Sequence, residues 1–449
     1  MSKQRIQLSD HFTYSRLLRF VLPCIGTMLF TSIYGIVDGL CVSNFVGKTA
    51  FAAVNLIMPL PMLLGTIGFM LGTGGSAIVG ITLGEGDQKK ADRYFTLFLL
   101  AALVSVSVLA VLGIVFLRPI AVLLGAKGEL LDYAVRYGRI LMLALPTFAL
   151  QNMFQSFFVT AEKPHLGFWF TVGAGCTNMV LDVLMVGIWG WGVEGAAIAT
   201  FISQLVGGVL PVFYFVDRSN SSRLHLCKTS FYSKVLRDAC INGSSELMTN
   251  LSMSLVNILY NYQLLRLAGE NGVAAYGVIM YAAFLFVAVF VGYAVGSAPI
   301  VSFHYGARNH AEVHNLYRKS LRLIAVVAVT LTLASMFIIP CVARIFVGYD
   351  AELLALTSRA FRLYALSFLI MGFNVYASSF FTALGDGVTS ALISFLRTLA
   401  FQVIAILLLP LLLGIDGIWL AVTAAELAAL AVSAAMLLTK DKVFHYRKA

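Results

Sequence analysis

Twelve apolar stretches, each long enough to cross a lipid bilayer, follow one another along this chain of 449 residues. A helix needs about 20 apolar residues to span the hydrocarbon layer. Hydrophobic residues make up 60% of the sequence and charged residues only 12%, so a water-soluble fold would expose apolar surface on every side. We therefore expect an all-α integral membrane protein. The predicted helices cover residues 16–46, 50–84, 94–117, 131–161, 165–190, 194–216, 238–267, 272–306, 319–343, 353–384, 388–413 and 417–439.

The basic residues divide unevenly between the two sides of the predicted helix bundle. An even number of spans puts both termini on one side, and that side carries 21 of the 31 Lys and Arg residues, against 9 in the opposite loops. The positive-inside rule then places both termini in the cytoplasm of a protein of the cell (plasma or inner) membrane. The net charge of +10 faces anionic lipid headgroups in this arrangement, so nucleic acid is not an expected partner.

An internal duplication organises the chain. Sliding the sequence on itself by 222 residues aligns the two halves without a gap, pairing for example Gly84 with Gly306 and Gly192 with Gly414. Six helices per half give two lobes related by a pseudo-twofold axis along the membrane normal, as in one class of secondary transporters. Two such lobes can rock about a central cavity. The expected division is an N-terminal lobe at 1–217, a cytoplasmic linker at 218–237 and a C-terminal lobe at 238–449.

Several sequence motifs resemble those of the multidrug and toxic compound extrusion (MATE) family, over nearly the whole chain. They are Pro23 and Asp38 in the first helix, GEGD at 84–87, NMVLD at 178–182, GAAIAT at 195–200, GSSELM at 243–248 and GVAAYGVIMY at 272–281. The motifs of the second half are most similar to the MepA-like bacterial branch. The resemblance implies twelve helices in two six-helix lobes, and export of cationic drugs and dyes driven by inward flow of protons or sodium.

Two carboxylates, Asp38 and Asp182, lie deep within predicted helices of the N-terminal lobe. An ionised carboxylate at a bilayer centre costs at least ~2.5 kcal/mol unless it is paired or hydrated. A helical rise of ~1.5 Å per residue puts both, with Thr200, in the outer half of the lobe, and Asn178 lies one turn before Asp182. These four residues, which match the family motif, form the predicted ion-coupling site, because two carboxylates held close can share a proton. Structural hydrogen bonding inside the bundle is the alternative.

Other side chains are assigned to substrate contact, because thioether and aromatic groups adapt to varied apolar cations. The predicted set is Tyr34, Asn152, Glu246, Met253, Asn257, Met280, Tyr281 and Asn374. For Glu246, attraction of a substrate cation, proton relay and a structural role all stay open.

Two further features concern the helices themselves. Pro23 removes a backbone hydrogen bond inside the first helix, which predicts a hinge or a static kink. Arg397 and Glu426 fall at similar depth on the last two helices and are predicted to form a structural ion pair.

The sequence thus predicts an antiporter, coupled to protons rather than sodium, that exports cationic or amphipathic drugs by alternating access. A sodium-coupled exporter and a lipid-linked precursor flippase of the same superfamily remain alternatives. Four embedded acids against one embedded Arg favour a cationic substrate over an anionic lipid headgroup. A membrane enzyme is the third interpretation. Beyond the carboxylate pair, however, the sequence shows no nucleophile, base or metal constellation at one depth. We expect no cofactor and no metal, membrane lipids as surroundings, and a monomer.

Overall fold

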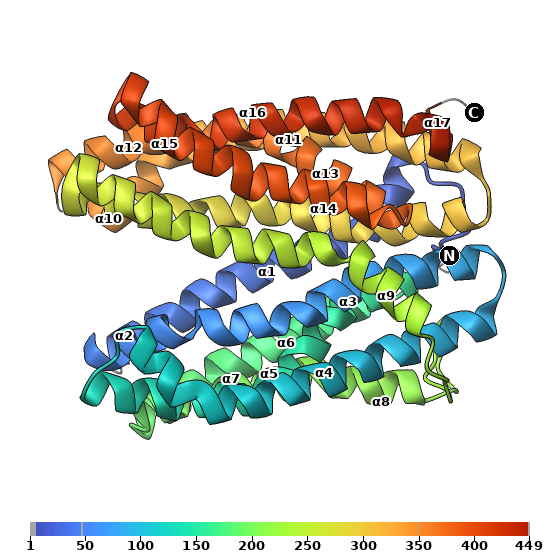
Figure 1. Cartoon of the computed structure of the whole chain (residues 1–449), viewed down its shortest axis with the longest axis horizontal. Coiled ribbons are helices and arrows are strands. Elements are labelled where there is room, and N and C mark those ends of the chain that lie inside the picture. Colours follow the sequence, from blue (N-terminus) through green and yellow to red (C-terminus); the bar gives the residue numbers. More distant parts are fainter. Residues whose placement is uncertain (1–5, 46–47, 349, 448–449) are drawn as a thin grey trace.

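Helices account for the regular secondary structure of the computed structural model, which describes residues 6–45, 48–348 and 350–447 (Figure 1). The first half contains α1 (Tyr14–Phe45), α2 (Lys48–Ile57), α3 (Pro59–Gly84), α4 (Gln88–Leu123), α5 (Glu129–Thr160), α6 (Pro164–Asp182), the π-helix η1 (Val183–Ile188), α7 (Gly192–Gly208) and α8 (Leu210–Val216). The second half contains α9 (Ser233–Asn242), α10 (Ser244–Gly306), α11 (His310–Val347), α12 (Ala351–Ala365), α13 (Phe368–Ala383), α14 (Gly387–Phe395), the π-helix η2 (Leu396–Ala400), α15 (Phe401–Leu413), α16 (Ile415–Thr439) and α17 (Asp441–Phe444).

The number of membrane spans agrees with the prediction of twelve. Among the described residues, ten helices are long and apolar enough to cross a membrane, and the pair α12 and α13, bent by 46°, adds an eleventh. Helix α10 has 63 residues, which at a rise of ~1.5 Å per residue would be three times as long as a bilayer is thick. It turns at Gly269, where φ is 62° and ψ is −152°. Its two arms are therefore separate spans.

Several spans that hydropathy predicts as single helices are broken. The second span ends α2 at Ile57 and resumes with Pro59, which has no N–H to continue the helical hydrogen bonds. The seventh span begins as α9 and changes direction at Gly243, and the tenth bends between Ala365 and Phe368. Hydropathy does not register these breaks because it averages side-chain character over a window and carries no information on φ and ψ.

The 222-residue repeat extends to the backbone conformation. Gly192 and Gly414, which the repeat pairs, have φ values of 59° and 60°. Gly86 and Arg308, also paired, have φ values of 88° and 55°. Left-handed φ is uncommon for a residue with a side chain, so Arg308 adopts it because the turn, rather than the residue, requires it. The same turns thus recur in both halves.

The residues after the paired turns at Gly86 and Arg308 also match. Asp87 accepts a hydrogen bond from the backbone N–H of Lys90 at 3.0 Å, and Asn309 accepts one from the backbone N–H of Glu312 at 3.1 Å. Each side chain satisfies an N–H group that the first turn of the next helix would leave free. The repeat therefore conserves the N-cap geometry although the capping residues differ.

Both described chain ends lie on one side of the helix bundle, which we call the terminal side (Figure 1). The backbone N–H of Phe12 donates to Glu312 at the start of α11, and Nδ1 of His314 lies 3.0 Å from the carbonyl oxygen of Tyr446. The opposite side, where α10 turns at Gly269, is the distal side. The two halves of the chain lie closest near the terminal side and spread toward the distal side (Figure 1).

Glycines bring the two halves together near the terminal side. A Cβ atom on Gly84 would lie 2.7 Å from the backbone nitrogen of Ala307, and one on Gly306 would lie 2.7 Å from the carbonyl carbon of Ile81. Both distances are too short for a side chain, so α3 and α10 pack backbone to backbone. The repeat pairs Gly84 with Gly306, so the two contacts are related by the pseudo-twofold axis.

A third glycine marks the pseudo-twofold axis itself. A Cβ atom on Gly80 would lie 2.8 Å from Cβ of Ser302, and these two residues are one repeat length apart. A residue meets its own counterpart only on the axis that relates the two. The axis therefore passes between α3 and α10 at this contact.

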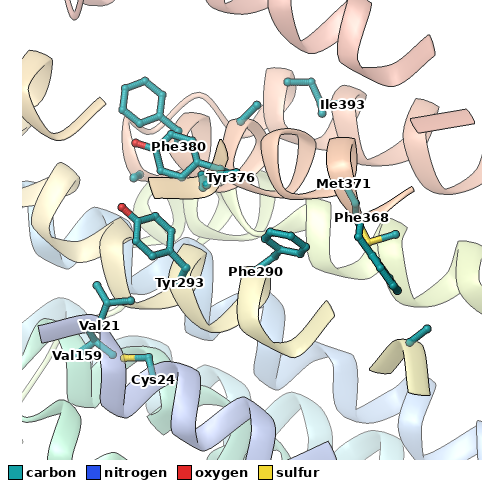
Figure 2. Close-up of a cluster of buried hydrophobic side chains, with 14 of the residues drawn as sticks. Val21, Cys24, Val159, Phe290, Tyr293, Phe368, Met371, Tyr376, Phe380 and Ile393 are labelled. Carbon is teal, nitrogen blue, oxygen red and sulfur yellow. The ribbon is translucent and has the colours of Figure 1, made fainter. Parts of the chain in front are cut away.

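One hydrophobic core crosses the boundary between the two halves (Figure 2). Val21 and Cys24 of α1 and Val159 of α5 lie on one side of Tyr293 in α10, and the hydroxyl of Tyr293 donates to Ser320 at 2.8 Å. The core continues in the second half through Phe290, Phe368, Met371, Tyr376, Phe380 and Ile393. The buried core of the second half is thus continuous with residues of the first half across the interface.

Candidate functional site

Asp182 occupies the end of α6 and is fully buried. The helix widens directly after it into the π-helical turn of η1, a distortion that often accompanies functional sites. Asn178 lies one turn earlier, is 2% exposed, and its Nδ2 meets no acceptor within the described residues. The helix therefore presents a carboxylate and an amide in a buried position near a widened turn.

Helix α1 packs closely against α6, and Gly175 allows this approach. A Cβ atom at Gly175 would lie 3.2 Å from Cδ1 of Tyr34 and closer still to the ring of Phe30. Position 38 is one turn beyond Tyr34, and Asn178 is about one turn beyond Gly175, so the two positions lie at similar height. The side chain of Asp38 lies outside the described residues. The helix backbone nevertheless brings its position beside α6.

Thr200 lies on α7, which packs against both α6 and η1. It is half-buried, and its hydroxyl donates to the carbonyl oxygen of Ala196 in the same helix at 3.0 Å. Both lone pairs of the hydroxyl oxygen therefore remain available to an incoming proton donor or cation. The elements that carry the four predicted ion-coupling residues are thus mutually packed.

Pro23 is buried in α1, which continues as a helix through this position. The carbonyl oxygen of Pro23 accepts a hydrogen bond from the hydroxyl of Thr27 at 2.9 Å. A cavity of about 10 Å³, lined by Cys24, Thr27 and residues of α5, α6 and α10, lies beside it. The proline thus sits where α1 meets both halves.

The first arm of α10 presents a polar stripe, formed by Glu246, Asn250, Met253, Asn257 and Asn261. These residues are spaced three or four apart and therefore share one helix face. Met253 is 42% exposed and Asn257 is exposed, whereas Glu246 is half-buried. Three of the five were predicted substrate contacts, and helical spacing from them would also have revealed Asn250 and Asn261.

The polar stripe leads to an open groove of about 500 Å³ on the distal side. It is lined by Asn261, Tyr262, Leu265, Glu270, Val273 and Ala274, which flank the turn at Gly269. One carboxylate, one aromatic ring and several apolar side chains thus line a single groove. Sequence reasoning missed Glu270, which lies in a predicted loop.

Asn257 also belongs to a tyrosine network. Its Oδ1 accepts a hydrogen bond from the hydroxyl of Tyr276 at 2.8 Å, and the ring of Tyr276 stacks on Tyr260 with centroids 4.8 Å apart. The hydroxyl of Tyr260 donates to the carbonyl oxygen of Ile418 at 3.0 Å. Since the repeat pairs Tyr260 with Asp38, the second half holds a buried, hydrogen-bonded tyrosine where the first half has a carboxylate.

The predicted substrate contact at Asn374 requires correction. Asn374 is fully buried, and its Nδ2 donates to the Glu426 carboxylate at 2.7 Å and to the Glu426 carbonyl oxygen at 2.9 Å. Its Oδ1 accepts from the hydroxyl of Ser433 at 2.9 Å. Every polar atom of the amide is engaged, so Asn374 holds α13 against α16 rather than facing a substrate.

Arg397 and Glu426 lie close to each other, with Nε and Oε1 3.9 Å apart. Arg397 lies on η2, and its NH1 meets no acceptor within the described part of the chain. The second oxygen of Glu426 is the one that binds Asn374. The Arg397 guanidinium therefore makes one long contact to a carboxylate that Asn374 also binds.

The remaining predicted substrate contacts are dispersed. Asn152 on α5 is 4% exposed, and its Nδ2 lacks an acceptor among the described residues. Tyr281 is 47% exposed and Met280 is half-buried, both on the second arm of α10. Asn152 is thus in the interior of the first half, away from the stripe.

Comparison with known proteins agrees with this architecture. The MatE family model matches twice, at residues 23–184 and 247–408, once in each half of the chain. The multidrug export protein MepA of Staphylococcus saprophyticus is 21% identical over 436 residues, covering 96% of this chain and 95% of that protein. MepA of Staphylococcus aureus is 22% identical over 433 residues, with coverage of 96% and 95%.

Solved structures share the fold over the full length. A crystal structure of MATE in complex with MaL6 superposes with a TM-score of 0.92 at 22% identity, and a MOP superfamily transporter from Pyrococcus furiosus superposes at 0.90 with 23% identity. Both cover 100% of this chain and 100% of the other. The two family matches span most of the described helices. The chain therefore belongs to the MatE family of membrane transporters.

Proposed function

We propose that this transporter exports lipophilic organic cations in exchange for protons, by alternating access of a cavity between its two halves. The observation that carries the proposal is the fully buried carboxylate of Asp182, at the junction of α6 and η1 beside α1. An ionised acid buried in a membrane helix is destabilising, so such residues are rare and commonly mark ion or proton pathways. The names of the MepA relatives, multidrug export proteins, support drugs as the substrate class.

The direction of transport follows from the charge asymmetry. The terminal side carries the excess of Lys and Arg, so it faces the cytoplasm in this proposal. The glycine contacts close the two halves on that side, which makes the described conformation the one open to the outside. The polar stripe on α10 and the distal groove with Glu270 would then line the exit route of the cation.

The coupling step requires that one site be either protonated and neutral, or ionised and paired with the drug cation. Asp38 and Asp182 would share a proton taken up from outside, since two nearby carboxylates rarely ionise together in a low dielectric. Loss of charge would release the drug cation. Asn178 and Thr200 would supply hydrogen bonds to the same chamber. With one oxygen from each residue, the same site would offer sodium four ligands, so sodium remains the alternative coupling ion.

Transport by purified protein in proteoliposomes tests the proposal. Ethidium should be driven across the bilayer by an imposed pH gradient, and Asp38→Asn and Asp182→Asn should each abolish this movement, because Asn resembles the neutral acid. Asp217→Asn, an exposed carboxylate outside the spans, is the matched control and should leave transport unchanged. Ethidium movement that follows a sodium gradient but ignores pH would overturn the proton assignment. Full activity of both aspartate variants would overturn the site.

A further inference from the structure

We propose that the N-terminal segment Leu8–Phe12 is a strap that ties the two halves together on the terminal side and detaches at Glu162 when the halves part. The inference rests on the proposed alternating access, which requires the terminal side to open once per cycle. The strap lies between the end of α5 in the first half and the start of α11 in the second, and its ends are anchored by one glutamate from each half.

The first anchor is Glu162, in the turn between α5 and α6. Its Oε1 accepts a hydrogen bond from the backbone N–H of Leu8 at 2.9 Å and also pairs with NH1 of Arg223. Leu8 is fully buried, so the contact is shielded from solvent. The anchor thus combines a charge-assisted hydrogen bond with a buried leucine side chain.

Glu162 itself adopts an unfavourable backbone conformation. Its φ is 60°, in the left-handed region that favours glycine, and the corresponding turn of the second half, between α13 and α14, has Gly385 with φ of 82°. Residues with a side chain rarely adopt this region, and such strain is often found at sites where the side chain has a role. Here the carboxylate that the strain positions is the one that binds Leu8.

The second anchor is Glu312, in the first turn of α11. Its Oε1 accepts from the backbone N–H of Phe12 at 2.9 Å, and its Oε2 lies 2.6 Å from Nδ1 of His11. The carbonyl oxygen of Phe12 accepts from Nδ2 of Asn315 at 3.1 Å and from Nζ of Lys319 at 2.6 Å. Four contacts therefore fix this end of the strap.

The side chain of Phe12 adds to the second anchor. It is fully buried, with its ring edge-to-face to Phe20 of α1 at 6.0 Å and to His304 of α10 at 6.4 Å. The two anchors are thus unequal, because the Glu162 end holds Leu8 by one backbone hydrogen bond and the Glu312 end holds several groups. When the halves separate, the weaker end yields first, and the strap stays with the second half.

Replacing Glu162 with glycine tests the strap without imposing backbone strain. Glu162→Gly removes the carboxylate and suits a φ of 60°, so it should fold at least as readily as the native chain. The reporter is a single cysteine placed by Ser302→Cys in a chain without its six native cysteines, because Ser302 is fully buried where α3 meets α10. A membrane-impermeant maleimide then measures opening of the terminal side in nanodiscs, without gradient or drug.

Glu162→Gly should raise the labelling rate of the reporter about tenfold or more, the scale of a lost hydrogen bond to a charged group. Glu85→Gly is the matched control, since Glu85 is an exposed glutamate in the turn after α3 on the same side, and it should leave labelling unchanged. Leu8→Pro removes the N–H partner instead of the carboxylate. It should raise labelling as well, and the double variant should label no faster than the stronger single one.

Unchanged labelling in Glu162→Gly, an equal rise in Glu85→Gly, or additive effects of Glu162→Gly and Leu8→Pro would each overturn the strap. The outcome is separate from that of the proposed function, because labelling without gradient or drug reports the opening of the terminal side alone. Failed ethidium transport with the expected labelling would overturn the transport proposal and leave the strap standing.

Discussion

The contact of Gly80 with Ser302 offers the sharpest test of how the two halves meet, because the residues can be exchanged. In Gly80→Ser, two serines would face each other across the pseudo-twofold axis with Cβ atoms 2.8 Å apart before relaxation, closer than real Cβ atoms come to other heavy atoms. Relief to an ordinary separation of about 3.4 Å or more means moving α3 and α10 apart by at least ~0.6 Å. Overpacking of this kind costs about 1–3 kcal/mol.

The overpacking destabilises only the conformation in which the terminal side is closed, because the contact is absent when the halves are apart. The equilibrium should therefore shift toward opening by roughly 5- to 150-fold. Cys24 of α1 reports this opening, because it is 4% exposed and packs against Gly296 of α10. With the other five cysteines replaced, its maleimide labelling rate should rise by that factor in Gly80→Ser.

The exchanged variant Gly80→Ser with Ser302→Gly provides the decisive comparison. It restores one glycine and one serine at the axis, with their helices swapped, and the opposite changes in helix propensity largely cancel. Its Cys24 labelling should return close to the native rate. Gly277→Ala, on the same helix α10 but with open space around its Cβ position, should have no effect. Labelling in the exchanged variant as fast as in Gly80→Ser would refute the axial contact.

Two further variants probe charged contacts by thermal unfolding in detergent. Burial alone would raise the pKa of Asp386, but the Lys440 ammonium at 2.9 Å and hydrogen bonds from Thr389 hold it below its ordinary value. Asp386→Asn should therefore lower stability at pH 7 by about 1–3 kcal/mol, and the difference should shrink as the pH falls below about 3.9; a difference that persists in acid would contradict the ionic contribution. Arg397→Met should destabilise by leaving Glu426 without its cation, and adding Glu426→Gln should recover part of the loss, whereas additive losses would exclude a pair.

The architecture was largely predictable because it depends on composition and period. Twelve apolar runs and a gapless repeat suffice to predict an all-helical, two-lobed membrane protein, and the paired glycines of the repeat turned out to lie at the contact between α3 and α10. The breaks at Met58, Gly243 and Ser367 were missed, since they are local changes of the backbone that a hydropathy average does not resolve. Helix count thus follows from the pattern of side chains, whereas helix continuity depends on φ and ψ.

The candidate site was predictable only in part, because burial and partners depend on tertiary contacts. Asp182 stands out in sequence as a lone acid in an apolar span, and it is fully buried. Asn374 looked equally suitable as a drug contact, but its amide is used up by Glu426 and Ser433. Glu162 and Glu312 gave no signal at all, since both occupy polar turns where a glutamate is ordinary. Only the bonds to Leu8 and Phe12 distinguish them.

The position of Glu312 also distinguishes the strap from the segment that the first half holds on the terminal side. The repeat pairs Glu312 with Lys90, and both residues follow the same left-handed turn and N-cap. A lysine has no acceptor for a backbone N–H. The first half holds its extended linker further along α4, where Asp92 accepts the backbone N–H of His225 at 3.0 Å and Thr96 accepts that of Cys227 at 3.1 Å. Glu312→Lys should therefore release Phe12, expose its ring and raise Ser302→Cys labelling beyond that of Glu162→Gly, because the stronger anchor is lost.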